Sequence, residues 1–409
     1  MSSYASHTNR TLHLVSEPVL NPTGQLFACQ LRAGATDEQG ARELTDDEVS
    51  AVMTNALSSG ALDVLMRARP TFMPMSKRLL LEGFPTVLPT NAILDIDAAD
   101  LEDAAVRQQF DQLRGLGYAF SFARWTPDTA PALLSQAKYL KVDSRIPSKS
   151  NLSARNTHGR HARLMATHVH SPATFEQALN AGCSLFEGHY FERPTPSVTR
   201  DLGVRRVALA KLMATVNKAQ VTPTEIEAVI KADAALTVRV LRSVNSSAFG
   251  IRREVHSVSQ AIVLLGVDQV KRWVSVWSFL GLQRSGNNEL LHAATKRARA
   301  CERVAELMQL DPGAYFLTGL CSLLDAMLGQ PMIEILSELP LPSEVNAALT
   351  GARNKHRAVL DAVVAFGHAE WEAAARACRE AGVDGATLND AYLDALGWAN
   401  EIQELAQAA

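Results

Sequence analysis

The first half of the chain alternates between short apolar stretches and amphipathic helical stretches. Eight stretches have the length and residue types of strands, and they begin at residues 10, 24, 71, 91, 117, 139, 162 and 183. Amphipathic segments such as 46–67 and 101–116 lie between most of them. About eight strands within roughly 200 residues are typical of an α/β barrel rather than an open doubly wound sheet. The sequence therefore predicts a TIM-like (β/α) barrel.

The alternation weakens and then stops. Residues 145–161 carry little apolar periodicity, so the helix expected there is short or absent and the barrel is partly reduced. Pro194 and Pro196 indicate a linker. Beyond it no strand pattern recurs, and Thr222 begins a capping box with Pro223 at the first helical position. We expect a disordered N-terminus over 1–10, the barrel over 11–196 and an all-α domain over 197–409.

Composition narrows the class of protein. The chain has 409 residues, of which 47% are hydrophobic and 20% charged, as in a globular protein of two domains. Its net charge of −3 gives no electrostatic argument for binding nucleic acid or an anionic membrane. The five cysteines are scattered without a CxxC pair, which predicts reduced thiols, and Cys29 reads as a core residue. With no apolar leader and no membrane-length apolar run, we expect a cytoplasmic protein.

Barrel enzymes place their chemistry at the carboxyl ends of the strands. A divalent-metal hydrolase needs several oxygen ligands that converge on one or two ions. At the strand ends only Asp95, Asp143 and Glu187 offer carboxylates, and Arg124 would repel a cation. The strand ends therefore predict a poor metal site. The positions in chain order are Gln30, Pro74, Asp95, Ala123, Arg124, Lys141, Asp143, Thr167, His170 and Glu187.

Four stretches of this half resemble the EAL domain, the barrel family of cyclic di-GMP phosphodiesterases. The stretches are EPVLNPTGQLFACQLR (17–32), LRGLGYAFSFARW (113–125), YLKVDS (139–144) and LFEGHYFERP (185–194). The last three follow one another in the family's order with plausible spacing. The resemblance runs from Glu17 to Pro194 and implies a barrel of that family.

Matched residue by residue, the resemblance implies that most functional groups of the family are missing. The signature glutamate, a metal ligand, falls on Gln30, and the asparagine ligand of the third strand falls on Pro74. The paired aspartates fall on Ala123 and Arg124. The arginine that contacts the dinucleotide falls on Gly34.

The later strands show the same loss. The two glutamates of the seventh-strand motif fall on Thr167 and His170. What remains of the family's pattern is Asp95 in place of a glutamate, Lys141, Asp143, and Glu187 in place of an amide. The resemblance thus implies a degenerate EAL barrel without two-metal hydrolysis, and the missing contacts argue against binding of cyclic di-GMP.

The second half resembles the HDOD domain, a helical relative of the HD and HD-GYP metal phosphohydrolases. The resemblance rests on LRSVNSSAFG (241–250) and VHSVSQAIVLLG (255–266) within residues 221–274. The His–Asp pair of the hydrolytic relatives falls near Ser322 and Leu323, so the resemblance implies that this metal site is lost as well. A barrel followed by an HDOD domain resembles the bacterial family of combined EAL–HDOD proteins.

Several residues allow more than one interpretation. His168 and His170 stand two apart on an expected strand and would share a face, where they could bind Zn²⁺ or Ni²⁺. His158 and His161 could add ligands. The alternative, which the pattern favours, is a set of polar residues that meet solvent at a strand end.

Two basic residues of the barrel leave similar alternatives. Lys141 is either a retained phosphate contact or, as we favour, the partner of Asp95 or Asp143, because a buried lysine needs a counter-charge. Arg124 either binds a phosphate in the vacant pocket or fills it with a salt bridge to Asp95 or Glu187.

A basic cluster on the early helices of the second half raises nucleic-acid binding as an alternative. Such a site would carry interleaved aromatic residues, and only Trp273 and Trp277 are available, at a spacing that indicates core or interface. The pattern favours a solvated helix face. The cluster consists of Arg239, Arg242, Arg252, Arg253, Lys271 and Arg272.

The leading hypothesis is a non-catalytic bacterial signalling or scaffold protein that works by protein–protein interaction, without a cofactor, nucleic acid or membrane. Its partner is not identified by the sequence, and a homodimer fits the resemblance. A second hypothesis is a sensor that holds cyclic di-GMP or another anion with Arg124, Lys141 and His170. A third is a hydrolase with a metal site rebuilt from Asp95, His168, His170 and Glu187.

Overall fold

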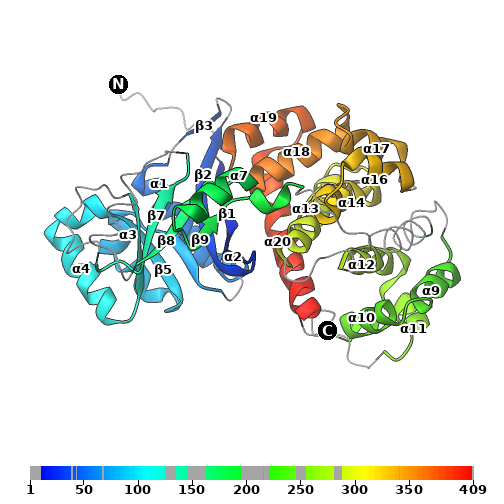
Figure 1. The fold of residues 1–409 in the computed structure, drawn as a ribbon, viewed down its shortest axis with the longest axis horizontal. Coiled ribbons are helices and arrows are strands. Elements are labelled where there is room, and N and C mark those ends of the chain that lie inside the picture. The colour runs from blue at the N-terminus through cyan, green and yellow to red at the C-terminus, as the bar shows by residue number, and fades with distance from the viewer. Residues whose placement is uncertain are drawn as a thin grey trace, which may run out of the picture. The chain divides into compact units, whose positions relative to one another are not determined.

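The chain forms two compact units, shown in Figure 1. One unit comprises Met1–Phe191 with Asp361–Leu393, and the other comprises Glu192–Leu360 with Asp394–Ala409. The computed structural model describes residues 11–37, 40–42, 44–66, 69–124, 135–145, 162–194, 215, 221–245, 255–280, 288–339 and 341–407. The expected disordered N-terminus and the expected boundary at 196/197 lie outside these residues and stay predictions.

Eight strands of the first unit close into a barrel, as the sequence predicts. The order around the barrel is β1, β9, β8, β7, β6, β5, β4 and β2, and β2 pairs with β1 to close it, while β3 adds to the free part of β2. The strands are β1 (Thr11–Leu20), β2 (Leu26–Asp37), β3 (Gly40–Arg42), β4 (Thr71–Pro74), β5 (Ala92–Asp97), β6 (Ala119–Arg124), β7 (Tyr139–Asp143), β8 (Arg163–Thr167) and β9 (Leu185–Glu187).

Strand β1 departs from the pattern of a parallel barrel, because it runs antiparallel to both β2 and β9. Only residues 21–25 join β1 to β2, which is too short for a crossover helix. The Asn21 side chain closes this turn by accepting hydrogen bonds from the backbone N–H groups of Thr23 and Gln25. Strand β1 pairs with β9 only at Val19 and Leu20, so residues 11–16, 31–37 and 40–42 extend beyond the barrel as a β arm.

The helices of the barrel begin where the local sequence supplies caps. Thr45 and Ser171 form reciprocal capping boxes, and Ser76 and Asp103 cap with their side-chain oxygens. The helix expected over 46–67 is divided into two, and the weak helix expected over 145–161 lies outside the described residues. The helices are α1 (Asp46–Ser58), α2 (Ala61–Met66), α3 (Lys77–Leu81), α4 (Ala104–Gly115) and α7 (Pro172–Asn180), with short 3-10 helices at Phe84–Val87, Ala98–Glu102 and Tyr190–Glu192.

The second unit is all-α in its described residues, as expected. Thr222, Asp233 and Ser257 act as N-caps in this unit. Its helices are α9 (Pro223–Lys231), α10 (Ala234–Val244), α11 (Val258–Leu265), α12 (Val267–Leu280), α13 (Asn288–Leu307), α14 (Pro312–Cys321), α15 (Leu324–Leu328), α16 (Met332–Glu338) and α17 (Ser343–Leu349). Helices α18 (Lys355–Gly367) and α20 (Gly385–Gln407) have residues in both units, and α19 (Trp371–Ala381) belongs to the first.

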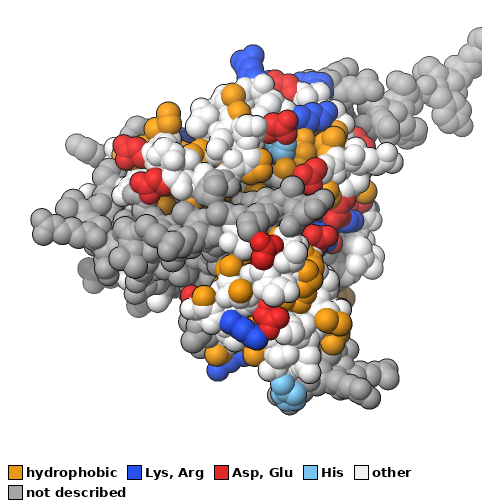
Figure 2. Space-filling model, turned by 90° about the vertical axis from the view of Figure 1, so that its right-hand side faces the viewer, with side chains coloured by type: hydrophobic (Ala, Val, Ile, Leu, Met, Phe, Trp, Pro, Cys, Tyr) orange, Lys and Arg blue, Asp and Glu red, His pale blue; other side chains and the backbone are white. Residues whose placement is uncertain are grey.

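The cysteines, the helix lengths and the surface charges can be compared with what the composition predicts. All five cysteines are buried, and none of them forms a disulfide bond. In the described part of the chain, no single helix has both the length and the apolar content of a membrane span. On the face drawn in Figure 2, lysine and arginine side chains lie scattered among acidic ones rather than in one patch.

The basic cluster of the second unit is only partly described, because Arg252 and Arg253 lie outside the described residues. Arg272 forms an ion pair with the fully buried Glu302. Trp273 and Trp277 are buried and stack with ring centroids 5.7 Å apart. These two aromatic side chains are therefore core residues, as their spacing indicates.

Candidate functional site

The side chains at the mouth of the barrel follow from the alternation along each strand. Residues two apart on a strand point to the same face of the sheet. The apolar interior layer includes Val19. Because β1 is antiparallel, Glu17, two residues before Val19, reaches the same level as the carboxyl ends of the other strands. Four further strands change from an apolar to a polar inward residue: Ala28 to Gln30, Ile93 to Asp95, Tyr139 to Lys141 and Leu185 to Glu187.

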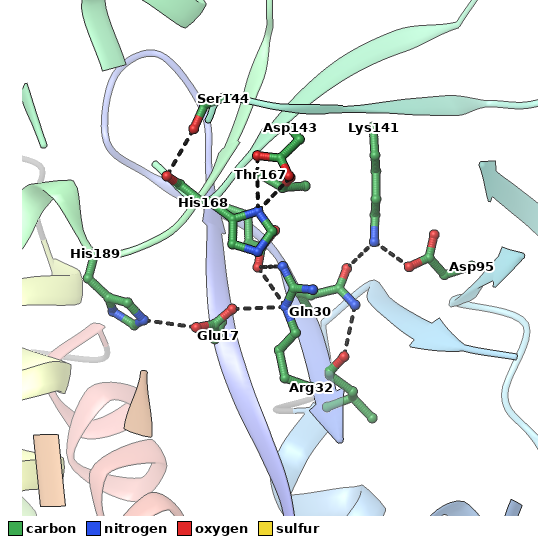
Figure 3. Close-up of polar contacts among 12 residues, drawn as sticks. Glu17, Gln30, Arg32, Asp95, Lys141, Asp143, Ser144, Thr167, His168 and His189 are labelled. Carbon is green, nitrogen blue, oxygen red and sulfur yellow. Dashed lines mark hydrogen bonds and ion pairs between the residues drawn. The ribbon is translucent and has the colours of Figure 1, made fainter. Parts of the chain in front are cut away.

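Lys141 joins two of the predicted positions (Figure 3). Its Nζ donates a hydrogen bond of 2.6 Å to Gln30 Oε1 and forms an ion pair with Asp95 Oδ2. The Lys141 and Asp95 side chains are only 6% and 7% exposed. The Nζ also lies 5.3 Å from the centroid of the Phe72 ring, whose face attracts a cation. Of the two partners expected for Lys141, Asp95 and Asp143, it is Asp95 that forms the ion pair.

Arg32 joins a second group of mouth residues. Its Nε donates to Glu187 Oε1 at 2.9 Å and to Glu17 Oε2 at 3.2 Å, and its Nη2 forms an ion pair with Glu187. Glu17 Oε1 also lies 3.1 Å from His189 Nε2. Both carboxylates are buried, and one guanidinium lies between two acids and reduces their mutual repulsion.

The pKa values of Glu17 and Glu187 are shifted in opposite directions. Burial raises the pKa of Glu187 to about 7; Arg32 opposes this rise and the charge of Glu17 adds to it. Burial also acts to raise the pKa of Glu17, but hydrogen bonds with His189 and Glu187 and the charge of Arg32 hold it well below its usual range. We therefore assign the ionised form to Glu17 and the titrating proton to Glu187.

A third group lies at the ends of β7 and β8. Asp143 binds the exposed Arg145 through a pair of hydrogen bonds, including one of 2.6 Å from Arg145 Nη2 to Asp143 Oδ2. His168 Nδ1 lies 3.1 Å from Thr167 Oγ1 and 3.6 Å from Asp143 Oδ1. Burial, helped by the charges of Arg32 and Arg145, lowers the pKa of His168 to about 4, so this imidazole is neutral at pH 7.

The argument that His168 and His170 share a strand face is wrong. Strand β8 ends at Thr167, and His168 has a left-handed backbone with φ of 59°, which breaks the alternation. The Ser144 hydroxyl donates to the His168 carbonyl at 2.9 Å and supports this turn. The two imidazole centroids are 6.1 Å apart and nearly perpendicular. His158 and His161 lie outside the described residues.

The other predicted positions at the mouth carry little chemistry. Pro74 ends β4 beside Asp95, and Ala123 lies exposed near the end of β6. Arg124 is the last residue of β6, and its side chain lies outside the described part of the structure. The two interpretations of Arg124, a phosphate contact and a salt bridge, therefore stay predictions.

At the predicted His–Asp position of the helical unit, the side chain of Arg297 lies beside Ser322. Ser322 ends α14, and its hydroxyl donates to the Gly319 carbonyl at 2.7 Å. Arg297 Nη1 donates to Ser322 Oγ at 3.4 Å, while Nη2 forms a buried ion pair with Glu192. Leu323 is buried core.

Comparison with known proteins covers the whole chain. Residues 206–374 match the HDOD domain. The chain is 26% identical over 410 residues to the uncharacterized protein YuxH of Bacillus subtilis, covering 95% of this chain and 98% of YuxH. It is 24% identical over 409 residues to the cyclic di-GMP phosphodiesterase CdgJ of Vibrio cholerae, covering 97% of this chain and 94% of CdgJ. These similarities support the assignment of this chain to the EAL–HDOD family.

A solved structure is also similar to this EAL–HDOD chain. It is the Bacillus subtilis YkuI protein, which has an EAL domain and was solved in complex with c-di-GMP and calcium. The match has 11% identity and a TM-score of 0.37, and it covers 62% of this chain and 72% of YkuI.

The residues of this EAL–HDOD barrel do not fit the metal pair that the EAL resemblance implies. Two buried oxygens, Asp95 Oδ1 and Glu187 Oε2, make no hydrogen bond. They belong to different groups, however, and each carboxylate already binds Lys141 or Arg32. No three of the mouth residues Glu17, Asp95, Asp143, His168, His170 and Glu187 place ligand atoms within 4.8 Å of one another. The rebuilt site of Asp95, His168, His170 and Glu187 is therefore not assembled.

The position of the family's dinucleotide arginine is covered in this EAL–HDOD chain. Gly34 lies on the β arm, and a Cβ placed there would come within 2.2 Å of the Trp371 indole. The indole thus packs directly on the backbone of β2, where no side chain other than glycine's hydrogen fits. A side chain at position 34 cannot reach toward a ligand without displacing Trp371.

Three residues of the ion-pair network at the mouth were absent from the site predicted from the sequence: Glu17, Arg32 and His189. The two-residue alternation along a strand could have indicated Glu17 and Arg32, because Glu17 stands two residues from the inward-facing Val19 and Arg32 two residues from Gln30. This inference also requires the antiparallel register of β1, which places Glu17 opposite Gln30. His189 carries no spacing signal, because it follows the end of β9.

Proposed function

We propose that this EAL–HDOD protein is a non-catalytic, cytoplasmic signalling protein that acts by protein–protein interaction in a cyclic di-GMP network. The observation that carries the proposal is that each described carboxylate at the barrel mouth already holds a cationic side chain. Asp95 binds Lys141, Asp143 binds Arg145, and Glu17 and Glu187 both bind Arg32.

Energetics support this reading for the buried groups. A divalent ion at Asp95 or Glu187 would have to displace Lys141 or Arg32 from its partner, and stranding a buried charge costs about 3–5 kcal/mol. The glutamine at position 30 offers one neutral oxygen, which already accepts from Lys141. Activation of water for phosphodiester hydrolysis needs converging oxygen ligands and an open coordination position, and these side chains supply neither.

The helical unit supports the same conclusion independently. At its predicted metal position a serine and a buried leucine stand where ligands would be needed, and Arg297 occupies the neighbourhood. The link to cyclic di-GMP comes from similarity to CdgJ, whose name states that activity. Two domains of hydrolase ancestry with internal cations at both sites favour binding of a protein partner, a second copy of the chain included, over chemistry.

The test compares the full chain with CdgJ in the same assays. Hydrolysis of cyclic di-GMP to the linear dinucleotide is followed with Mg²⁺ and with Mn²⁺, and binding is measured by calorimetry. We expect turnover by CdgJ only and no heat of binding for this chain. Turnover that disappears in Asp95→Ala would refute the non-catalytic function. Micromolar binding without turnover would replace the scaffold by the sensor hypothesis.

A further inference from the structure

Residues Asp361–Leu393, which we call the strap, belong to the same compact unit as the barrel. They comprise the end of α18, all of α19 and the start of α20. The family match to the HDOD domain extends into this segment, to residue 374. Residues near the C-terminal end of the chain are therefore part of the compact unit that contains the barrel.

Tyr392 of the strap completes the hydrogen bonding of β1. Strand β9 pairs with β1 only at Val19 and Leu20. Tyr392 OH accepts a hydrogen bond from Ser16 N at 3.0 Å and donates one to Ser16 O at 3.2 Å. One buried hydroxyl thus satisfies both backbone groups of the residue directly before Glu17, and such groups are costly to leave unpaired.

Aromatic residues hold the strap to the β arm. His13 of β1 stacks on Trp371, with ring centroids 5.7 Å apart, and meets the edge of Phe366 at 5.0 Å. His13 Nε2 also lies 2.7 Å from Thr36 Oγ1 on the paired strand. Together with the Trp371 indole on Gly34, these contacts fix the arm against α18 and α19.

The strap reaches the mouth network at a second point. His368 stacks on His189 with centroids 3.6 Å apart and an angle of 16°. His189 Nε2 in turn lies 3.1 Å from Glu17 Oε1, and Glu17 binds Arg32. Glu17 is thus held by the strap from two sides, through its preceding backbone and through the imidazole that binds its carboxylate.

We propose that the strap is a conformational device whose docking is linked to the Glu17–Arg32–Glu187 ion-pair network at the barrel mouth. A change that removes the charge of Glu17 loosens its contacts to His189 and Arg32 and thereby loosens the strap. Conversely, release of the strap frees the backbone at Ser16 and weakens the network, because coupling between two sites is reciprocal. The inference does not depend on whether the barrel binds a nucleotide.

Hydrogen exchange of the full chain, read by mass spectrometry of peptides, tests the link. Glu17→Gln keeps the shape of the side chain and removes its charge. Asp143→Asn is the matched control, because it makes the same change at the mouth in a residue whose contacts are Arg145 and His168. We expect amides of the strap to exchange on the order of tenfold faster in Glu17→Gln, and no change of the strap in Asp143→Asn.

The reverse experiment uses Tyr392→Phe, which removes only the hydroxyl. We expect faster exchange in residues 11–20, and in the double variant with Glu17→Gln an effect smaller than the product of the two single effects. If Tyr392→Phe does not fold, Arg32→Gln serves as the second variant, with exchange in the strap as its readout. Strap exchange that is unchanged in Glu17→Gln, or that rises equally in α4 and β5, overturns the proposal.

Discussion

Replacement of Lys141 by methionine is the most direct test of how the barrel mouth is held together. The variant keeps most of the apolar stem and removes the ammonium. Asp95 is then left as a buried carboxylate with its Oδ1 already unpartnered, and Gln30 Oε1 loses its donor. Removal of one member of a buried ion pair costs about 3–5 kcal/mol, because the other charge stays buried without compensation.

We therefore expect Lys141→Met to lower the free energy of unfolding of the barrel by about 4 kcal/mol. This is a large part of the roughly 5–15 kcal/mol that stabilises a domain. The measurement is urea titration read by hydrogen exchange of β5 and β7 amides, which reports the barrel separately from the helical unit. Lys77→Met is the matched control, since the Lys77–Asp103 pair is 43% and 34% exposed, and its midpoint should hardly move.

The double variant Lys141→Met with Asp95→Asn identifies the cause of the loss. It removes the stranded charge, so a substantial part of the lost stability should return. A loss below about 1 kcal/mol in Lys141→Met would be the size of an exposed pair. That result, or a double variant no more stable than the single one, would refute the buried-charge argument and with it the main support for the non-catalytic function.

Three further predictions concern other parts of the chain. Gly34→Ala should destabilise the first unit by about 1–3 kcal/mol in urea, because its Cβ collides with Trp371. Burial lowers the pKa of His13 to about 4, so on acidification the unfolded chain takes up a proton at this residue before the folded chain does. The free energy of unfolding should therefore fall by up to about 1.4 kcal/mol per pH unit as the pH falls from 6.5 toward 4. His13→Gln should remove that slope. Arg297→Met should cost the helical unit about 3–5 kcal/mol, because Glu192, whose side chain is only 9% exposed, loses its partner. Thermal unfolding measures the loss, and no loss would refute a stabilising ion pair.

The architecture followed from the sequence because it rests on periodicity. Strand-length apolar stretches in the first half and helical spacing in the second predict a barrel and an all-α unit, and both are observed. The direction of β1 could have been predicted too, since residues 21–25 are too few for a crossover. The added strand β3 has only three residues and no apolar pattern of its own.

The site was predictable only in part, for a physical reason. Strand ends give the list of side chains at the mouth, and burial requires a partner for Lys141, so its pairing with Asp95 could be expected. Which cation binds Glu187 depends on three-dimensional register. Arg32 reaches it because β1 and β2 pair antiparallel next to β9, a relation that spacing along the chain does not contain.

The strap shows the limit of reading a chain in sequential blocks. Tyr392 and Ser16 are 376 residues apart, and nothing near either residue indicates the other. A weak signal exists at Gly34, because a glycine within a strand often marks the close approach of another group. The identity of that group, Trp371, comes only from the fold.

The ion pairs at the barrel mouth follow one physical rule. When a metal ligand is lost from a buried acidic site, the acids that remain are charges without compensation, and such charges destabilise a fold by several kcal/mol each. A chain can remove them or supply an internal cation. Here Arg32 binds both Glu17 and Glu187. Gln30 and Arg32 are therefore best understood together. A charged side chain at position 30 would add another acid to the mouth, and Arg32, which already binds Glu17 and Glu187, could not compensate that charge in addition.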